Sequence, residues 1–382
     1  VPGIMAMENW DDHDRSHRTI ARDLAFNYLN TVGENGVIFT NGDNDTFPLW
    51  YAQEVEGVRT DVRVCNLSYL QTDWYIDQMK RRAYLSDPLP FSLEKSQYRV
   101  GTRDIVYMLD RIEGYVDMKE AMQFLASENP RTKQVPNYSG RVEYLPSKSF
   151  LFRADRNRIM ENGLVSPRYE HLIDSLMYVD VNKDRILKNE VMVLDLLAHM
   201  EWERPIYFAV TVGTENYVGL EPYFQLEGFG YQVVPIRAEG SDGQTGRVDT
   251  EKMYDNVMNK FIFDGWNDPR VYLDENHLRM AMNIRNNLSR LATALIEEGQ
   301  IEKAVKVLDK TMEVLPHPRV PHNYFSLFLA EAYFEADEME KGDSITRDLA
   351  VENLQELGFF TSLHPALRAG SMNEIQRNIA IY

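Results

Sequence analysis

Acidic and amide side chains are concentrated in one short stretch of this chain, directly after an apolar run. The run Val37–Thr40 has the β-branched and aromatic composition of a buried strand. The residues after it that carry side-chain oxygens are Asn41, Asp43, Asn44 and Asp45. Alternating oxygen ligands are typical of sites for hard divalent cations, and the same residues also occur in ordinary turns. The stretch is therefore a candidate binding site.

A second polar stretch follows the next apolar run along the chain. Residues 61–67 predict another short strand, and polar residues at and beyond its end include Asn66 and Asp73. The carboxyl ends of neighbouring parallel strands meet at one edge of a sheet, where open α/β sheets bind ligands. If strands 37–41 and 61–67 are neighbours, Asn66 and Asp73 face Asp43 and Asp45 there. Carboxylates buried together at that edge would have perturbed pKa values.

The third candidate group is the consecutive run of Asp11, Asp12, His13 and Asp14 near the start of the chain. A carboxylate beside an imidazole suits a divalent cation or acid–base catalysis. Four adjacent residues do not all point at one ion, however, and Asp14 is well placed to cap a following helix. We expect His13 and Asp14 to line the same pocket as the strand-end residues.

Three functions remain open for these residues. In one, His13, Asp43 and Asp45 form the active site of an autonomous metal-dependent hydrolase or transferase, with a divalent cation at Asp43 and Asp45. In another, the strand-end residues contact a ligand or partner without catalysis, and no cofactor is expected. In the third, the chain is a protein-interaction scaffold and the loop is structural. The sequence has no Gly-rich phosphate loop, G-x-S-x-G, H-E-x-x-H or C-x-x-C pair that would favour other chemistry.

The elements that must position these residues alternate between helix and strand. Apolar periodicity predicts helices over 15–31, 47–56 and 74–84, with strands over 37–41 and 61–67 between them. This order predicts an α/β fold with a Rossmann-like, mostly parallel sheet. Further predicted helices cover 103–113, 117–127 and 184–200, and further strands cover 148–153, 204–210 and 231–236.

The last third of the chain has a different pattern. A polar, Gly-rich segment over 238–249 predicts a linker between an α/β domain (1–240) and a helical domain (241–382). Large and small residues then recur as in a tetratricopeptide repeat, whose paired helices pack closely. The positions are Leu291, Ala292, Leu295, Gly299, Ala304, Leu308 and Pro316, with a looser copy at Leu329, Ala330, Tyr333, Gly342 and Leu349. The C-terminal domain is therefore predicted to be all-α and tetratricopeptide-like.

Composition limits the classes of function. A chain of 382 residues predicts two domains. The net charge of −18 argues against a nucleic-acid partner, because phosphate contacts need clustered Lys and Arg. The single cysteine, Cys65, lies in a predicted strand and is expected to be a packed, structural thiol. No apolar run approaches the ~20 residues of a membrane span. The apolar start, Val1–Met7, is either a plain boundary of a cut fragment or the trailing edge of an apolar segment that was removed.

Several long phrases of the sequence resemble one known family. They are ENWDDHDRSHR (8–18), FTNGDNDTFPLWYAQEVEGVRTDVRV (39–64), NLSYLQTDWYIDQMKR (66–81) and RPIYFA (204–209). These phrases are similar to the soluble C-terminal region of a bacterial family of multi-span membrane proteins. The membrane half of that family is similar to protein O-mannosyltransferases, which are membrane-embedded glycosyltransferases. The resemblance covers most of the chain, including the tetratricopeptide-like end.

The resemblance implies a role without catalysis for the chain itself. Catalytic acidic residues in such transferases lie on the first external loop of the membrane half, so none is placed on this sequence. The implied location is the periplasmic face of the inner membrane. The implied partners are the protein's own membrane-spanning half, contacted by the α/β domain, and an acceptor polypeptide or other protein, bound by the helical repeats.

Overall fold

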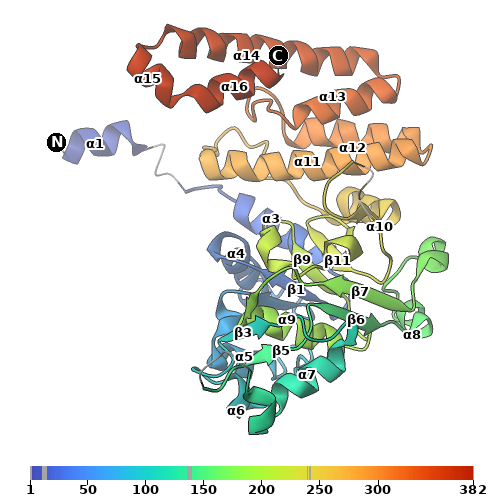
Figure 1. The fold of residues 1–382 in the computed structure, drawn as a ribbon. Helices are drawn as coiled ribbons and strands as arrows, with labels where there is room; N and C mark the ends of the chain where they lie inside the picture. Colours follow the sequence, from blue (N-terminus) through green and yellow to red (C-terminus); the bar gives the residue numbers. More distant parts are fainter. Residues whose placement is uncertain (1, 11–14, 136–139, 239, 241, 382) are drawn as a thin grey trace. The chain divides into compact units, whose positions relative to one another are not determined.

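The computed structural model describes residues 2–10, 15–135, 140–238, 240 and 242–381, which form two compact units (Figure 1). The larger unit is Leu24–Asn256, and the smaller one combines the residues up to Asp23 with those from Val257 onward. Strand β12 (Arg247–Val248) and helix α10 (Thr250–Asp255) belong to the larger unit. The domain boundary at residues 240 and 241 stays a prediction.

The main sheet of the larger unit has six strands in the order β12–β10–β11–β9–β1–β2. The other five strands are β1 (Val37–Thr40), β2 (Arg63–Asn66), β9 (Ile206–Ala209), β10 (Phe224–Leu226) and β11 (Gly230–Val233). Strand β1 pairs in parallel with β2 and β9, whereas β11 is antiparallel to β9 and β10. The sheet is therefore mixed. Every residue of β1, β2 and β9 is buried, which explains their nearly continuous apolar runs.

The helices around the parallel strands follow the predicted order. Helix α3 (Ile20–Thr31) precedes β1, α4 (Asp43–Glu54) joins β1 to β2, and α5 (Asp73–Met79) comes after β2 and the 3-10 turn η1 (Tyr69–Gln71). This strand–helix–strand order brings the carboxyl ends of β1 and β2 together, with Thr40 opposite Asn66. The polar residues that follow the two strands therefore lie at one edge of the sheet, as predicted.

Two three-stranded sheets complete the larger unit, in the orders β5–β3–β8 and β4–β6–β7. Their strands are β3 (Ile105–Met108), β4 (Val116–Asp117), β5 (Tyr144–Leu145), β6 (Ser149–Arg153), β7 (Leu176–Asp180) and β8 (Arg185–Leu187). Their helices are α6 (Lys95–Tyr98), α7 (Met118–Ala126), α8 (Arg156–Glu161) and α9 (Lys188–His199), and the remaining 3-10 turns are η2 (Pro130–Lys133), η3 (Pro167–Leu172), η4 (Thr214–Asn216) and η5 (Glu221–Tyr223).

The helix predicted over residues 103–113 is wrong. The segment forms β3, in which Val106 and Met108 are buried while Ile105 is exposed. This alternation has the period of a strand, and the β-branched pair Ile105–Val106 favours an extended backbone. The helix predicted over 184–200 begins later than expected, because its first residues form β8.

The smaller unit consists of helices in the residues that the structure describes. They are α1 (Pro2–Glu8), the π-helical turn η6 (Asn256–Lys260) at the junction with the larger unit, α11 (Glu275–Glu297), α12 (Ile301–Val314), α13 (Ser326–Glu335), α14 (Met339–Ser362), α15 (Pro365–Gly370) and α16 (Met372–Ile381). Helix α11 packs on α12 and α13 on α14 (Figure 1). Across the described ranges, no helix combines the length and apolarity needed to cross a membrane. The fold is thus mixed α/β with several sheets and a helical C-terminal region, as predicted at that level.

Candidate functional site

Helix α4 begins earlier than the sequence predicted. Its first residue is Asp43 and its N-cap is Gly42, whose φ of 100° lies in the region that favours glycine. Asp43, Asn44 and Asp45 therefore form the first helical turn, whereas the expected loop ran on to about residue 47. Carboxylates in a first turn interact favourably with the unpaired N–H groups and the positive end of the helix dipole.

Asp45 is the buried carboxylate of this turn. Its Oδ2 accepts a hydrogen bond of 3.1 Å from the Asn41 backbone N–H and one of 2.8 Å from the Thr211 hydroxyl. The Thr46 hydroxyl is 3.4 Å from Oδ1. Burial raises the pKa of Asp45 above its ordinary value, and the bonds from Asn41 and Thr211 oppose this rise. Asp45 therefore links β1, α4 and the turn after β9.

Asn66 joins the second strand end to the same network. Its side-chain nitrogen donates to the Thr46 hydroxyl at 2.8 Å, and its side-chain oxygen accepts from the Tyr69 backbone N–H at 2.9 Å. The Ser68 hydroxyl donates to the Asn41 side-chain oxygen at 2.8 Å. Asn41, Asp45 and Asn66 are thus brought together across the edge of the sheet, as the strand order predicted.

Three of the other predicted residues, Asp43, Asn44 and Asp73, do not enter this network. Asp43 and Asn44 are exposed, and Asp73 lies half-buried in the first turn of α5. Asp43 and Asp45 are two positions apart on one helix, so their side chains point in different directions. His13 and Asp14 lie outside the described residues, and their place in a pocket is untested.

The chemistry of the network is that of a set of internal hydrogen bonds. Within the described ranges, no group of three or more His, Cys, Asp or Glu side chains is arranged to hold a metal ion. A divalent cation at Asp43 and Asp45, and ligand contacts by the strand-end residues, stay predictions. Cys65 on β2 is fully buried, and burial raises its pKa to about 12, which favours the packed, structural thiol.

An aromatic series lies beside the network and was missed in the sequence. The ring centroids of Phe47 and Trp50 on α4 are 5.7 Å apart, and Trp50 stacks on Tyr69 at 6.1 Å. Tyr69 in turn lies 5.9 Å from Trp74 on α5. Phe47 is 45% exposed and Trp74 51% exposed, so both ends of the series reach the surface. The aromatic residues at positions 47, 50, 69 and 74 of the sequence could have indicated this series.

The phrases that carry the strand ends lie in the region that also matches a protein-family model. The model is described as TMEM260-associated domain 2, and it matches residues 21–252, which is more than half of the chain. The chain belongs to this family. Neither a curated protein nor a solved structure gives a match to the chain. The TMEM260-associated domain 2 region covers nearly all of the larger unit, including both strand ends and the aromatic series.

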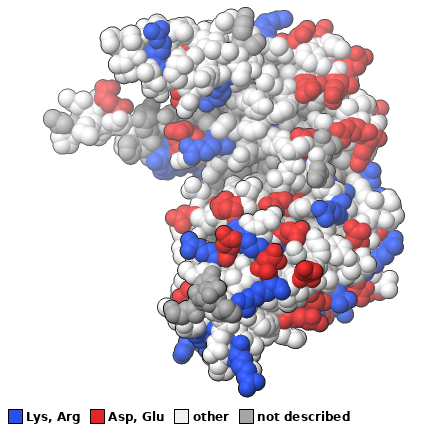
Figure 2. Space-filling view, viewed as in Figure 1, with Lys and Arg blue, Asp and Glu red and all other residues white. Residues whose placement is uncertain are grey.

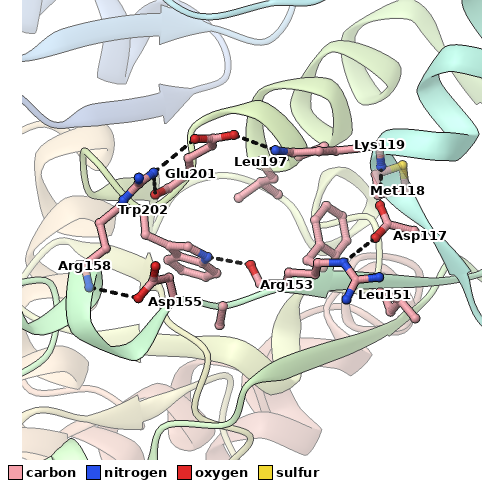
Figure 3. Close-up of a pocket in the computed structure, with 13 residues that line it drawn as sticks. Asp117, Met118, Lys119, Leu151, Arg153, Asp155, Arg158, Leu197, Glu201 and Trp202 are labelled. Atoms are coloured by element: carbon pink, nitrogen blue, oxygen red, sulfur yellow. Dashed lines mark hydrogen bonds and ion pairs between the residues drawn. The ribbon is translucent and has the colours of Figure 1, made fainter.

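The same family region holds a cavity that sequence reasoning also missed (Figure 3). Its lining includes Asp117, Arg153, Glu201 and Trp202, which come from separate segments of the chain. No spacing rule connects these residues, because β4, β6 and the turn after α9 bring them together only in the folded unit. Isolated charged residues in a long sequence gave no signal for this cavity.

Proposed function

We propose that this chain is a non-catalytic, soluble domain of a membrane glycosyltransferase-like protein. It would lie at the periplasmic face of the inner membrane and bind that protein's membrane-spanning half and an acceptor polypeptide. Membership of the TMEM260-associated domain 2 family supports the association with a membrane protein. The phrases that resemble the bacterial membrane family support the transferase-like half.

The observation that carries the proposal is the exposed aromatic surface of α4 and α5. Phe47, Tyr51 and Trp74 are each close to half exposed, and Phe47 and Trp74 belong to one aromatic series. Large aromatic side chains grouped at a surface are typical of protein-binding sites, where they bury much area at little entropic cost. This surface also adjoins Asp43, which supplies a polar edge for the contact with the membrane half.

The helical end is proposed to hold the acceptor. Leu291, Ala292 and Leu295 on α11 are fully buried, as are Ala304 and Leu308 on α12. These are the positions that a tetratricopeptide-like pair of helices packs together. Stacked pairs of this kind offer an extended surface to a polypeptide. The α/β part is proposed to be Rossmann-like, because polar residues follow the carboxyl ends of its parallel strands.

The acidic network supports a role in binding over catalysis. Asp45 is buried, its Oδ2 accepts from Asn41 and Thr211, and its Oδ1 lies 3.4 Å from the Thr46 hydroxyl. A general base instead needs an oxygen within reach of a substrate proton. On the face shown in Figure 2, acidic and basic side chains are interspersed over the larger unit.

The test separates the chain from its membrane half. The two would be expressed as separate polypeptides and purified together in detergent, with the Phe47→Ser/Trp74→Ser double variant compared with Tyr178→Ser. Tyr178 on β7 is 40% exposed and lies outside the aromatic series, so it is a matched control. We expect the double variant alone to lose co-purification. Equal recovery of all three proteins would overturn the proposed contact.

Acceptor binding is tested in the intact membrane protein. Removal of α11–α16 is expected to lower glycosylation of periplasmic acceptor polypeptides, measured by mass spectrometry, while the membrane half stays at its normal level. Unchanged glycosylation would exclude docking of the acceptor on the helical end.

A further inference from the structure

The cavity beside α7 and α9 has a volume of about 340 Å³ and is lined by residues of the larger unit only (Figure 3). This volume is at the lower end of the range for small-molecule sites. Leu151 on β6 and Leu197 on α9 supply apolar surface, while charged side chains surround the opening. The cavity therefore suits a small ligand with both an apolar and a polar surface.

The charged side chains around the cavity form a balanced set. Glu201 accepts from Lys119 at 2.6 Å and from Arg158 at 3.0 Å, and Asp117 accepts from Arg153 at 2.8 Å. With Asp155, the lining has three acids and three bases. Hydrogen bonds from Lys119 and Arg158 hold the pKa of Glu201 below its ordinary value, so this carboxylate is ionised at neutral pH.

Trp202 is held against the cavity by its backbone and by a hydrogen bond. Glu201 and Trp202 both have positive φ, 53° and 61°, although neither is glycine. Such a conformation is strained for a residue other than glycine and is concentrated at functional sites. The indole N–H donates to the Arg153 carbonyl at 2.7 Å, and the ring also packs against the buried cluster around Ile159. What Trp202 offers a ligand is therefore its ring surface.

These features discriminate between classes of ligand. An anion would meet Asp117, Asp155 and Glu201, and each nearby cation already has a carboxylate or carbonyl partner. A metal ion finds no arranged group of three ligands among the described residues. A wholly apolar ligand would remove water from these charged groups without offering them hydrogen bonds in its place.

A neutral sugar has the matching properties. Each of its hydroxyl groups both donates and accepts, so it suits a rim where carboxylates alternate with guanidinium and ammonium groups. The C–H groups on one face of a pyranose ring form an apolar patch that packs on an indole. We infer that this cavity binds a neutral carbohydrate, with Trp202 as the stacking surface and Glu201 and Arg153 as hydrogen-bonding groups. This site is separate from the aromatic series and from the helical end, and it does not depend on the proposed function.

The experiment uses the full 382-residue chain and saturation-transfer difference NMR. The probes are the methyl glycosides of mannose, glucose, galactose and N-acetylglucosamine, with inorganic phosphate and a neutral tetrapeptide as competitors. We expect transfer to the ring protons of at least one glycoside and no competition from phosphate or peptide. Silence from all four glycosides, or displacement by phosphate or by the peptide, would overturn the inference.

Variants connect the signal to this cavity. Trp202→Ala is expected to weaken binding at least about tenfold, equivalent to 1.4 kcal/mol. Glu201→Gln, which leaves the indole in place, is expected to weaken it about threefold, as for loss of one exposed ionic contact. Trp10→Ala, a change at an exposed tryptophan that lies outside the larger unit, is the matched control and should bind as the unaltered chain does. Retained binding in both Trp202→Ala and Glu201→Gln, with circular dichroism unchanged, would place the sugar elsewhere and exclude this site.

Discussion

The Thr211 hydroxyl donates a 2.8 Å hydrogen bond to the carboxylate of Asp45, across the carboxyl ends of β9 and β1. The two residues are 166 positions apart in the sequence. This bond connects the turn after β9 to the first turn of α4. Asp45 therefore stabilises the contact between these two segments of the parallel part of the sheet.

Replacing Asp45 tests this contact. Asp45→Ala leaves the Asn41 N–H and the Thr211 hydroxyl without their acceptor, and we expect a loss of about 2 kcal/mol in the free energy of unfolding. Denaturant unfolding followed by circular dichroism measures this loss. Asn44→Ala, one position away and exposed, is expected to change stability by about 0.5 kcal/mol or less. Equal losses in the two variants would contradict the assignment.

Arg59 is predicted to be irreplaceable by lysine. Its guanidinium donates to the carbonyls of Leu29, Val32 and Gly33 at the end of α3 and makes a two-pronged contact with Asp61. An ammonium group lacks this planar set of donors. We expect Arg59→Lys to destabilise the chain by about 1–3 kcal/mol, because buried carbonyls lose their donors.

The control for Arg59 is an ion pair on an exposed helix surface. Arg279 contacts Glu275 one helical turn away, and both side chains are mostly exposed. Arg279→Lys should leave the free energy of unfolding within about 0.5 kcal/mol of its original value. A comparable loss in the two variants would show that the carbonyl contacts of Arg59 contribute little.

His322 is predicted to make the smaller unit sensitive to acid. Burial, helped by the charges of Arg285 and His317, lowers the pKa of His322 to about 3. The groups around it are Arg285 from α11, the stacked ring of His317, the Ser326 hydroxyl at 3.0 Å and Glu352 of α14, which contacts His317. The folded state therefore favours the neutral imidazole.

The sign of the pH dependence follows from this lowered pKa. Unfolded His322 takes up a proton near pH 6.5 and folded His322 only near pH 3, so its contribution to stability is present above pH 6.5 and is lost on acidification. Between pH 6.5 and 5 we expect a loss of up to about 2 kcal/mol. Denaturant titrations at several pH values measure it. His322→Asn should flatten this slope and the exposed His364→Asn should not; parallel slopes in all three proteins would refute the prediction.

The close packing of α11 and α12 is tested with Ala304. Its side chain is fully buried on α12, and α12 packs on α11. Ala304→Leu adds volume to a filled interior and should destabilise the smaller unit by about 1–3 kcal/mol in thermal or denaturant unfolding. Ala366→Leu, on the exposed surface of α15, is expected to have little effect. An unchanged Ala304→Leu variant would mean that the two helices leave free space between them.

The edge of the sheet was easier to predict from the sequence than the side chains that contact one another there. The apolar runs ending at Thr40 and Asn66 are short and bounded by polar residues, so the pattern predicted both strands and, if the strands were neighbours, their common edge. The structure pairs them in parallel. The pattern did not predict where α4 begins, because Asp and Asn favour loops and first helical turns alike. The contact of Asp45 with Thr211 was hidden by sequence separation.

Other errors have equally local causes. The segment around Ile105–Met108 is apolar enough for either a helix or a strand, and its pairing with β5 and β8 decided the outcome. The cavity around Trp202 depends on tertiary placement of β4, β6 and α9, for which no local pattern exists. The buried positions of α11 and α12 were predictable because large and small apolar residues recur there at helical spacing.

The two-part composition of the smaller unit has a consequence for the order of folding during synthesis. The residues up to Asp23 are synthesised before the larger unit, whereas the helices from Val257 onward that share their unit are synthesised after it. The intervening Leu24–Asn256 segment is complete in the meantime and can form its sheets as a unit. The residues up to Asp23 therefore remain without the helices that share their unit until the entire larger unit has been synthesised. Chaperone binding to the residues up to Asp23 during synthesis is accordingly expected to cease once α11 and α12 have been made.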